Sequence, residues 1–188
     1  MHDAYGLPIP HVKEKTNNKY HIVPPSHPAF NKEIDNFDFL DKKVDIKKIA
    51  EEMIKMMEQA GAAGLAANQL GLEHRIFVLN TTPTKLVCIN PKIVYESEKM
   101  AVLEEGCLTF PGFFVKIRRP AEIRVRFQDE EGKMRSESLN GIVARAFQHE
   151  LDHLNGINYM DRAKKIHMDQ AKKKAKLIDR KLKRMGLA

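Results

Sequence analysis

The chain has 188 residues, of which 43% are apolar, with ten glycines and nine prolines. This composition suits a single globular domain over residues 1–188 and excludes a largely disordered or collagen-like chain. The formal net charge is +7, yet residues 162–184 hold eleven basic and two acidic side chains, so the rest of the chain is close to neutral. A concentrated basic tail indicates docking on a polyanion and argues against a protein that reads a DNA sequence.

The sequence predicts neither a membrane nor a secreted location. No run approaches the roughly 20 consecutive apolar residues of a membrane helix, and residues 1–6 lack the basic start and apolar core of a secretion signal. The two cysteines, Cys88 and Cys107, are too few for a disulfide framework. We therefore expect a cytoplasmic protein with reduced thiols and without membrane contact.

The first part of the chain predicts irregular structure followed by one core helix. Five prolines punctuate residues 1–40, an atypical N-terminal segment that we expect to form loops and edge structure. After the N-cap Asp45, apolar side chains recur at helical spacing until Gly61 supplies a stop. Met53 and Met57 in this helix are typical of core packing and not of a soft-metal site.

The second part predicts short strands and two further helices. The expected strands cover residues 75–79, 86–89, 93–95, 113–117, 123–127 and 133–139, with a hairpin turn at 129–132. A helix is expected at residues 140–153, with Gly156 just beyond its end. Apolar side chains three and four apart at 161–185 predict a basic C-terminal helix within 161–188. The order of elements indicates an α+β fold, a compact domain of antiparallel strands around the helix at 140–153.

The helix at 140–153 carries a His-Glu-x-x-His pattern, formed by His149, Glu150 and His153. Residues four apart lie one turn above each other, so both imidazoles project from one face and can share a metal ion. Glu150 is then placed to reach a water molecule on that ion, which is the geometry of metal-assisted hydrolysis. The alternative is an amphipathic helix whose histidines are solvated.

A third protein ligand would leave one open position on a tetrahedral metal ion. Two common sources are excluded, because Tyr159 stands where metzincins place a third histidine and no glutamate follows Glu150. The best remaining donor is Cys107, in a Gly-flanked turn at 104–112 where backbone can approach a ligand closely. His167 and the downstream aspartates are weaker candidates.

The two cysteines have different surroundings in the sequence. Cys88 lies in an apolar run, which is typical of a small buried side chain. Cys107 as a nucleophile paired with His149 is an alternative to metal ligation, although the His-Glu-x-x-His helix accounts for the histidines without it. A third segment, residues 61–69, is rich in small residues and ends in Gln69, whose amide can donate to an oxyanion. That segment can equally be a tight connection between a helix and a strand.

Together, these three segments resemble the peptide deformylase family. The family motif Gly-x-Gly-x-Ala-Ala-x-Gln corresponds to residues 62–69, Glu-Gly-Cys-x-Ser to 105–109, and Gln-His-Glu-x-x-His to 148–153. The resemblance implies that Cys107, His149 and His153 are the metal ligands and that Glu150 transfers the proton. It also implies that Gln69 and the backbone N–H of Leu108 donate to the oxyanion. The implied substrate-binding residues are Ala62, Ala63, Gly64 and Gly106. Two positions depart from the motifs, since Ala62 replaces the first glycine and Thr109 replaces the serine.

The resemblance also implies a reaction, a metal and two partners. Members of this family remove the formyl group from the N-terminal formyl-methionine of nascent polypeptides and release formate. Fe²⁺ is the expected ion, for which Zn²⁺, Ni²⁺ or Co²⁺ can substitute. Related enzymes with a basic extension dock on the ribosome near its exit tunnel, so residues 161–188 are expected to make salt-sensitive contacts with ribosomal RNA. The competing interpretations are a metalloprotease with a cysteine ligand and an RNA-binding module with a closed structural metal site.

Overall fold

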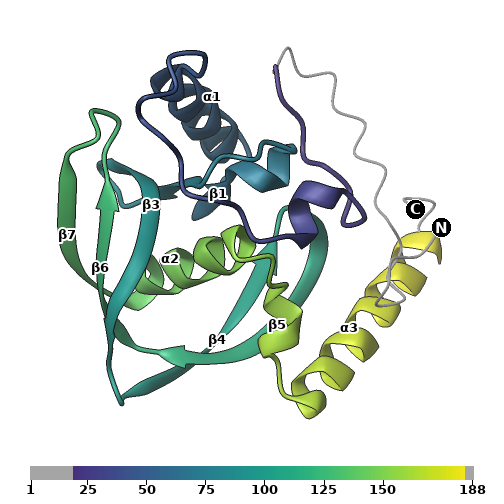
Figure 1. The fold of residues 1–188 in the computed structure, drawn as a ribbon. Coiled ribbons are helices and arrows are strands. Elements are labelled where there is room, and N and C mark those ends of the chain that lie inside the picture. The colour runs from purple at the N-terminus through teal and green to yellow at the C-terminus, as the bar shows by residue number, and fades with distance from the viewer. Residues whose placement is uncertain (1–18, 185–188) are drawn as a thin grey trace.

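Two antiparallel sheets and three α-helices make up residues 19–184, the part of the chain that the computed structural model describes (Figure 1). One sheet has the strand order β1-β2-β3-β6-β7, and β4 pairs with β5 in a separate hairpin. The strands are β1 Gly64–Ala66, β2 Ile76–Asn80, β3 Lys85–Glu96, β4 Met100–Cys107, β5 Phe110–Pro120, β6 Glu122–Gln128 and β7 Met134–Asn140. The helices are α1 Ile46–Gln59, α2 Gly141–Leu154 and α3 Lys165–Arg184, with 3-10 helices η1 Pro28–Asn31, η2 Ala67–Leu70 and η3 Tyr159–Arg162. This is the expected α+β class.

Several expected boundaries differ from the observed ones. Residues 86–89 and 93–95 belong to the single strand β3, which passes Pro91 because a register shift between Ile89 and Lys92 absorbs it. Strand β4 was not expected, since its consecutive glutamates interrupt any apolar alternation. The third helix begins at Lys165 and not at residue 161, because Ala163 is extended and separates η3 from α3.

Helix α1 forms as its sequence pattern predicts. The Asp45 carboxylate accepts a hydrogen bond from the Lys48 backbone N–H at 3.1 Å, which caps the first turn. Met53 and Met57 are fully buried in a cluster with residues of η2 and β2. The prediction that these methionines serve packing is confirmed.

Helix α2 lies between the five-stranded sheet and the β4–β5 hairpin (Figure 1). On the sheet side, the Phe147 ring meets Phe77 of β2 edge to face, with ring centroids 4.9 Å apart. On the hairpin side, Arg119 of β5 donates to the Asp152 carboxylate at 2.6 Å. Enclosure from both sides buries the polar residues of this helix.

Among the apolar side chains of helix α3 that the structure describes, those that pack on the protein lie in its first half. Met168, Ala171 and Ala175 contact the cluster that contains the inward-facing residues of β5. Leu177 and Ile178 are 65% and 46% exposed, so the apolar stripe expected over residues 168–185 turns toward solvent after Ala175. The side chain of Leu182 and all of Met185 lie outside the described part of the chain. Across residues 19–184, none of the helices combines the length and apolarity that a bilayer-spanning helix needs.

Residues 23–34, here called the N-terminal strap, cross the ends of η2 and α2. The Val23 N–H donates to the Gln69 carbonyl, and the Ile34 N–H donates to the Leu154 carbonyl, both at 2.8 Å. Arg75 donates to the carbonyls of Ile34 and Leu154 and so closes the crossing. The strap gives the irregular N-terminal segment a structural role, whereas residues 1–18 of that segment lie outside the described residues.

The strap passes so close to Gly156 that this position should not tolerate a side chain. Gly156 has φ +67°, and a Cβ there would lie 2.7 Å from the Lys32 carbonyl carbon. Gly61 has a similar φ of +60°, but none of the described residues comes within 4 Å of an added Cβ. Both alanine variants bear the left-handed backbone cost of about 1–2 kcal/mol, and Gly156→Ala should lose about 1–3 kcal/mol more through overpacking. Urea unfolding of the two variants measures the difference; equal losses would mean that the strap yields freely.

Candidate metal centre

Three side chains from two distant segments converge beside helix α2. Cys107 ends strand β4, and His149 and His153 lie one turn apart on α2. Their potential ligand atoms all lie within 4.8 Å of one another, and Cys107 Sγ is 3.3 Å from His153 Nε2. The structure thus brings together the three residues that the sequence singled out, although they are up to 46 positions apart.

The weaker ligand candidates lie elsewhere. Cys88 is fully buried in the core cluster of β2 and β6, where burial raises the pKa of its thiol well above its ordinary value. His167 lies on α3, with Nδ1 3.0 Å from the Lys116 carbonyl. Neither residue belongs to the convergent group, so the interpretation of Cys88 as a packing residue is supported.

The donor set of one thiolate and two imidazoles fits a transition-metal ion. Cys sulfur and His nitrogen bind zinc, iron and neighbouring metals, and three protein ligands leave a position open for a reacting molecule. Glu150, which follows His149 in α2, adds a buried oxygen to this region. Its Oε2 has no hydrogen-bond partner among the described residues. A polar atom left unpaired in a core is costly unless a ligand completes it. Burial raises the pKa of Glu150 to about 7, so its carboxyl group can gain or lose a proton near neutral pH.

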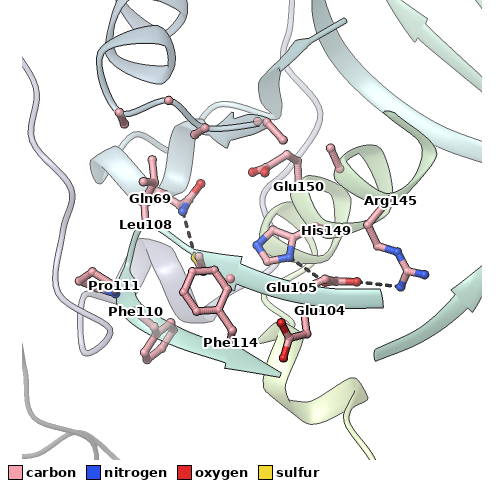
Figure 2. A pocket seen from close by; sticks show the side chains of 18 of the residues that line it. Gln69, Glu104, Glu105, Leu108, Phe110, Pro111, Phe114, Arg145, His149 and Glu150 are labelled. Carbon is pink, nitrogen blue, oxygen red and sulfur yellow. Dashed lines mark hydrogen bonds and ion pairs between the residues drawn. The ribbon is translucent and has the colours of Figure 1, made fainter. Parts of the chain in front are cut away.

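A cavity of about 430 Å³ opens onto Glu150 and His149, and Figure 2 shows both side chains pointing into it. The four residues expected to bind substrate all line this cavity: Ala62, Ala63, Gly64 and Gly106. Gln69, Cys107 and Leu108 line it as well. Gly64 permits a close approach of the Glu150 side chain, since a Cβ there would lie 2.6 Å from Glu150 Oε1. The small residues of this segment therefore leave room for the Glu150 carboxylate as well as for a ligand.

Gln69 is held rigidly with its nitrogen toward the cysteine. Its Oε1 accepts a hydrogen bond from the Ala66 backbone N–H at 2.9 Å, which fixes the orientation of the amide. Its Nε2 donates to Cys107 Sγ at 3.3 Å, as drawn in Figure 2, and to Thr109 Oγ1 at 3.3 Å. The amide N–H groups therefore face the place where the three ligand atoms meet, and the hydroxyl of Thr109 serves to orient them.

A buried ion network around Glu105 was not predicted from the sequence. Glu105 Oε2 is 2.9 Å from His149 Nδ1. Arg119 donates to both carboxylate oxygens of Glu105, at 2.7 and 2.9 Å, and Arg145 donates to one of them at 2.9 Å. One signal in the sequence could have found Arg119: in β5 it has the same parity as the apolar Val115 and Ile117, which places a charge on the buried face.

The network sets the charges of the site. Burial opposes ionisation of Glu105, but the hydrogen bonds from His149 and Arg119 outweigh it and lower the pKa of Glu105 to about 2. Burial likewise opposes a charge on His149, yet its hydrogen bonds with Cys107 and Glu105 raise its pKa to about 10. Burial, followed by the positive charges of His149 and Arg119, lowers the pKa of His153 well below its ordinary value. In the metal-free protein, His149 therefore holds a proton that a metal ion must displace, whereas His153 is neutral and ready to bind.

Comparison with known proteins finds consistent similarity. A family model described as polypeptide deformylase matches residues 19–169. The chain is 42% identical over 130 residues to the peptide deformylase of Rhizobium meliloti, which covers 66% of this chain and 75% of the relative. Its fold resembles the crystal structure of peptide deformylase from Thermotoga maritima, with a TM-score of 0.73 and 39% identity, covering 77% of this chain and 97% of that one. A Synechococcus elongatus peptide deformylase in complex with actinonin gives a TM-score of 0.77 at 28% identity, covering 90% and 93% of the two chains.

The lowered pKa of Glu105 makes the stability of the metal-free protein depend on pH. An ionised carboxyl with a folded pKa near 2 and an ordinary value of 4.5 stabilises the fold above pH 4.5, by about 3 kcal/mol, and this contribution is lost as pH falls toward 2. Urea unfolding should therefore show Glu105→Gln less stable than the parent at pH 7, with the gap narrowing toward pH 3.

The neighbouring Glu104→Gln is the matched control for this comparison. Glu104 pairs with Lys174 at 3.6 Å, and both side chains are about half exposed, so the change should cost less than about 1 kcal/mol. A gap for Glu105→Gln that is independent of pH would contradict the assignment of the ionised form.

Proposed function

The chain belongs to the polypeptide deformylase family, and from that premise we propose how its residues perform the family's reaction. The protein is a metal-dependent hydrolase that removes the N-formyl group from the formyl-methionine of nascent polypeptides. The observation that carries the proposed assignment of residues is the meeting of Cys107, His149 and His153 next to the buried carboxyl of Glu150.

We propose that these three ligands hold Fe²⁺ in the cell, for which Zn²⁺, Ni²⁺ or Co²⁺ can substitute. One thiolate and two imidazoles are compatible with each of these borderline ions. The bound ion supplies positive charge that lowers the pKa of water and polarises the formyl carbonyl group. Every other step is assigned to side chains and backbone groups of the chain itself.

Glu150 is assigned as the proton carrier. Its carboxylate takes a proton from the attacking water molecule and returns it to the amine that leaves the formyl carbon. Burial raises the pKa of Glu150 in the metal-free protein, which suits a group that must accept a proton and later release it. Glu150 is only 4% exposed, which limits the access of bulk water to that proton.

Gln69 and the backbone N–H of Leu108 are assigned as oxyanion donors. Both residues line the cavity beside Cys107, and the Gln69 amide is oriented before the substrate arrives. Donors fixed in advance stabilise developing negative charge without reorganisation, and each contributes on the order of 3 kcal/mol where such donors have been removed.

The formyl-methionyl peptide is assigned an extended course along the rim of the cavity. Strand β1 is an edge strand of its sheet and, among the described strands, pairs with β2 alone. Its free edge at Gly64 can therefore bind a peptide backbone. Gly112 also lines the cavity. The apolar side chains of Ile142 and Ala146, which also line the cavity, can receive the methionine side chain.

The exposed part of α3 is assigned to ribosome docking. Beyond Ala175 the helix presents solvent-exposed basic side chains beside the exposed Leu177 and Ile178. A helix that packs through one half and leaves a basic, partly apolar half in solvent has a surface to offer to ribosomal RNA near the exit tunnel. We assign the enzyme to the cytoplasm on the same grounds, since its substrate emerges there.

Glu150→Gln should abolish turnover while the protein still binds metal. The amide cannot exchange a proton, and loss of general acid–base catalysis costs about 10²–10⁴-fold in rate. Formate release from formyl-Met-Ala-Ser, measured with anaerobically prepared protein and followed by metal analysis, tests this. Glu98→Gln, at an exposed turn between β3 and β4, is the control and should retain the parental rate. Full activity of Glu150→Gln, or cleavage of internal peptide bonds by the parent protein, would contradict the assignment.

Removing the positive charges from the exposed half of α3 should weaken ribosome binding. The binding that remains should also depend less on salt concentration. Lys173, Lys176, Arg180 and Lys181 are all exposed, so replacing them with glutamine leaves the packed half intact. For every lysine or arginine that no longer reaches a phosphate, the logarithmic salt slope should fall by about 1.

The control for this experiment is an equal loss of charge elsewhere. Replacing the exposed Lys42, Lys43, Lys48 and Lys55 with glutamine changes the net charge by the same amount near α1. Co-sedimentation with ribosomes at several salt concentrations, with formate release as a check on folding, compares the two variants. Equal binding by both would argue against docking through α3.

A further inference from the structure

The two histidines of the metal centre are oriented in different ways. His149 Nδ1 is fixed by the Glu105 carboxylate at 2.9 Å. His153 Nδ1 is buried and has no hydrogen-bond partner among the described residues. Metal-binding histidines usually donate their second ring nitrogen to a carboxylate, a carbonyl group or water, which fixes the ring. The orientation of His153 must therefore come from other contacts.

The first of these contacts is the ring of Phe30. Phe30 belongs to η1 in the N-terminal strap and is 3% exposed, and its ring centroid lies 5.1 Å from that of His153 at an angle of 46°. The Phe30 ring also meets that of Phe110 at 6.0 Å. An imidazole that is 1% exposed and packed against a fixed aromatic face cannot rotate unless its neighbour moves.

The second contact is the side chain of Asn68, which is completely buried in η2. Its Nδ2 donates to the backbone carbonyl of His153 and, at 3.2 Å, to that of Ala29. The amide thus joins the last turn of α2 to the residue that precedes Phe30. The strap, η2 and α2 are held together at the backbone of the metal ligand.

We propose that Phe30 and Asn68 are positioning residues for the His153 imidazole, with the N-terminal strap supplying by packing the orientation that Glu105 gives His149 by a hydrogen bond. The proposal rests on the proposed metal ligation by His153. It assigns a function to a segment that lies outside all three motifs of the catalytic site, and it explains why the strap is tied to η2 and α2 on both sides of this contact, at Gln69 and at Leu154.

Removing either contact should loosen the metal without removing a ligand. Changes to groups that orient metal ligands typically cost 10–100-fold in metal affinity or activity. Phe30→Ala and Asn68→Ala should therefore release Co²⁺ to a chelator at least 10-fold faster than the parent and alter the visible absorption bands of the Co²⁺ protein. Turnover number should fall while KM for formyl-Met-Ala-Ser stays within about twofold, because neither side chain lines the substrate cavity.

Phe37→Ala is the matched control. Phe37 lies in the same N-terminal region and packs against Phe39 and His74, away from the metal centre. The Tm of each metal-free variant reports the general cost of losing a ring, which is buried at Phe30 and partly buried at Phe37. The proposal is supported if Phe30→Ala loosens Co²⁺ and Phe37→Ala does not, and it is overturned if the two release Co²⁺ equally. Should Phe30→Ala not fold, Phe30→Leu is judged by the same comparison.

The outcome for the parent protein separates this proposal from the proposed function. A parent that shows no Co²⁺–thiolate absorption or releases no formate would refute the assignment of the ligands. A parent that does both, with Phe30→Ala and Asn68→Ala indistinguishable from Phe37→Ala, would refute only the role of the strap.

Discussion

The site depends on one buried carboxylate. Glu105 accepts hydrogen bonds from two arginines and lies against His149, so a single desolvated charge joins β4, β5 and α2. Leaving such a charge unpaired in a core costs several kcal/mol, which makes any relative movement of these three elements unfavourable. Cys107 follows Glu105 by two residues in β4. The distance between the cysteine and the histidines is therefore fixed by the ion network before any metal binds.

The same network lets a polar helix occupy the middle of the molecule. So many charged and amide side chains would normally hold α2 at the surface, yet its buried polar residues include Arg145, Gln148, Asp152 and the three motif residues. Arg119 forms ion pairs with both Glu105 and Asp152, so the acidic groups of β4 and α2 share one guanidinium. Apolar contacts on the opposite face, such as Phe147 on Phe77, bind the helix to the sheet. Charge pairing on one side and packing on the other allow most of the polar side chains of α2 to be buried with partners.

The two histidines of the candidate metal centre are held in place in two different ways. An imidazole ligand must keep a fixed direction, and His149 achieves this through a charged hydrogen bond within the network. His153 is enclosed by an aromatic ring and by a helix turn that Asn68 holds from the side. The second arrangement involves the N-terminal strap, which joins the catalytic elements without contributing an atom to the cavity lining. Supporting contacts of this kind hold the side chains of a site in a fixed geometry.

The sequence by itself indicated the candidate metal centre and part of the fold: the spacing of His149, Glu150 and His153, the preference for Cys107 over Cys88, and the N-terminal cap of α1 follow from local periodicity and residue type. It also indicated the alternating strand at β6. Only the tertiary structure decided that β4 is a strand, that Arg119 and Arg145 meet Glu105, and that α3 leaves the body after Ala175. Helix and strand periodicity are local properties of the chain and can be read in order. Pairing of buried charges and the contact of Phe30 with His153 join residues far apart in the chain, so they depend on how the elements pack in space.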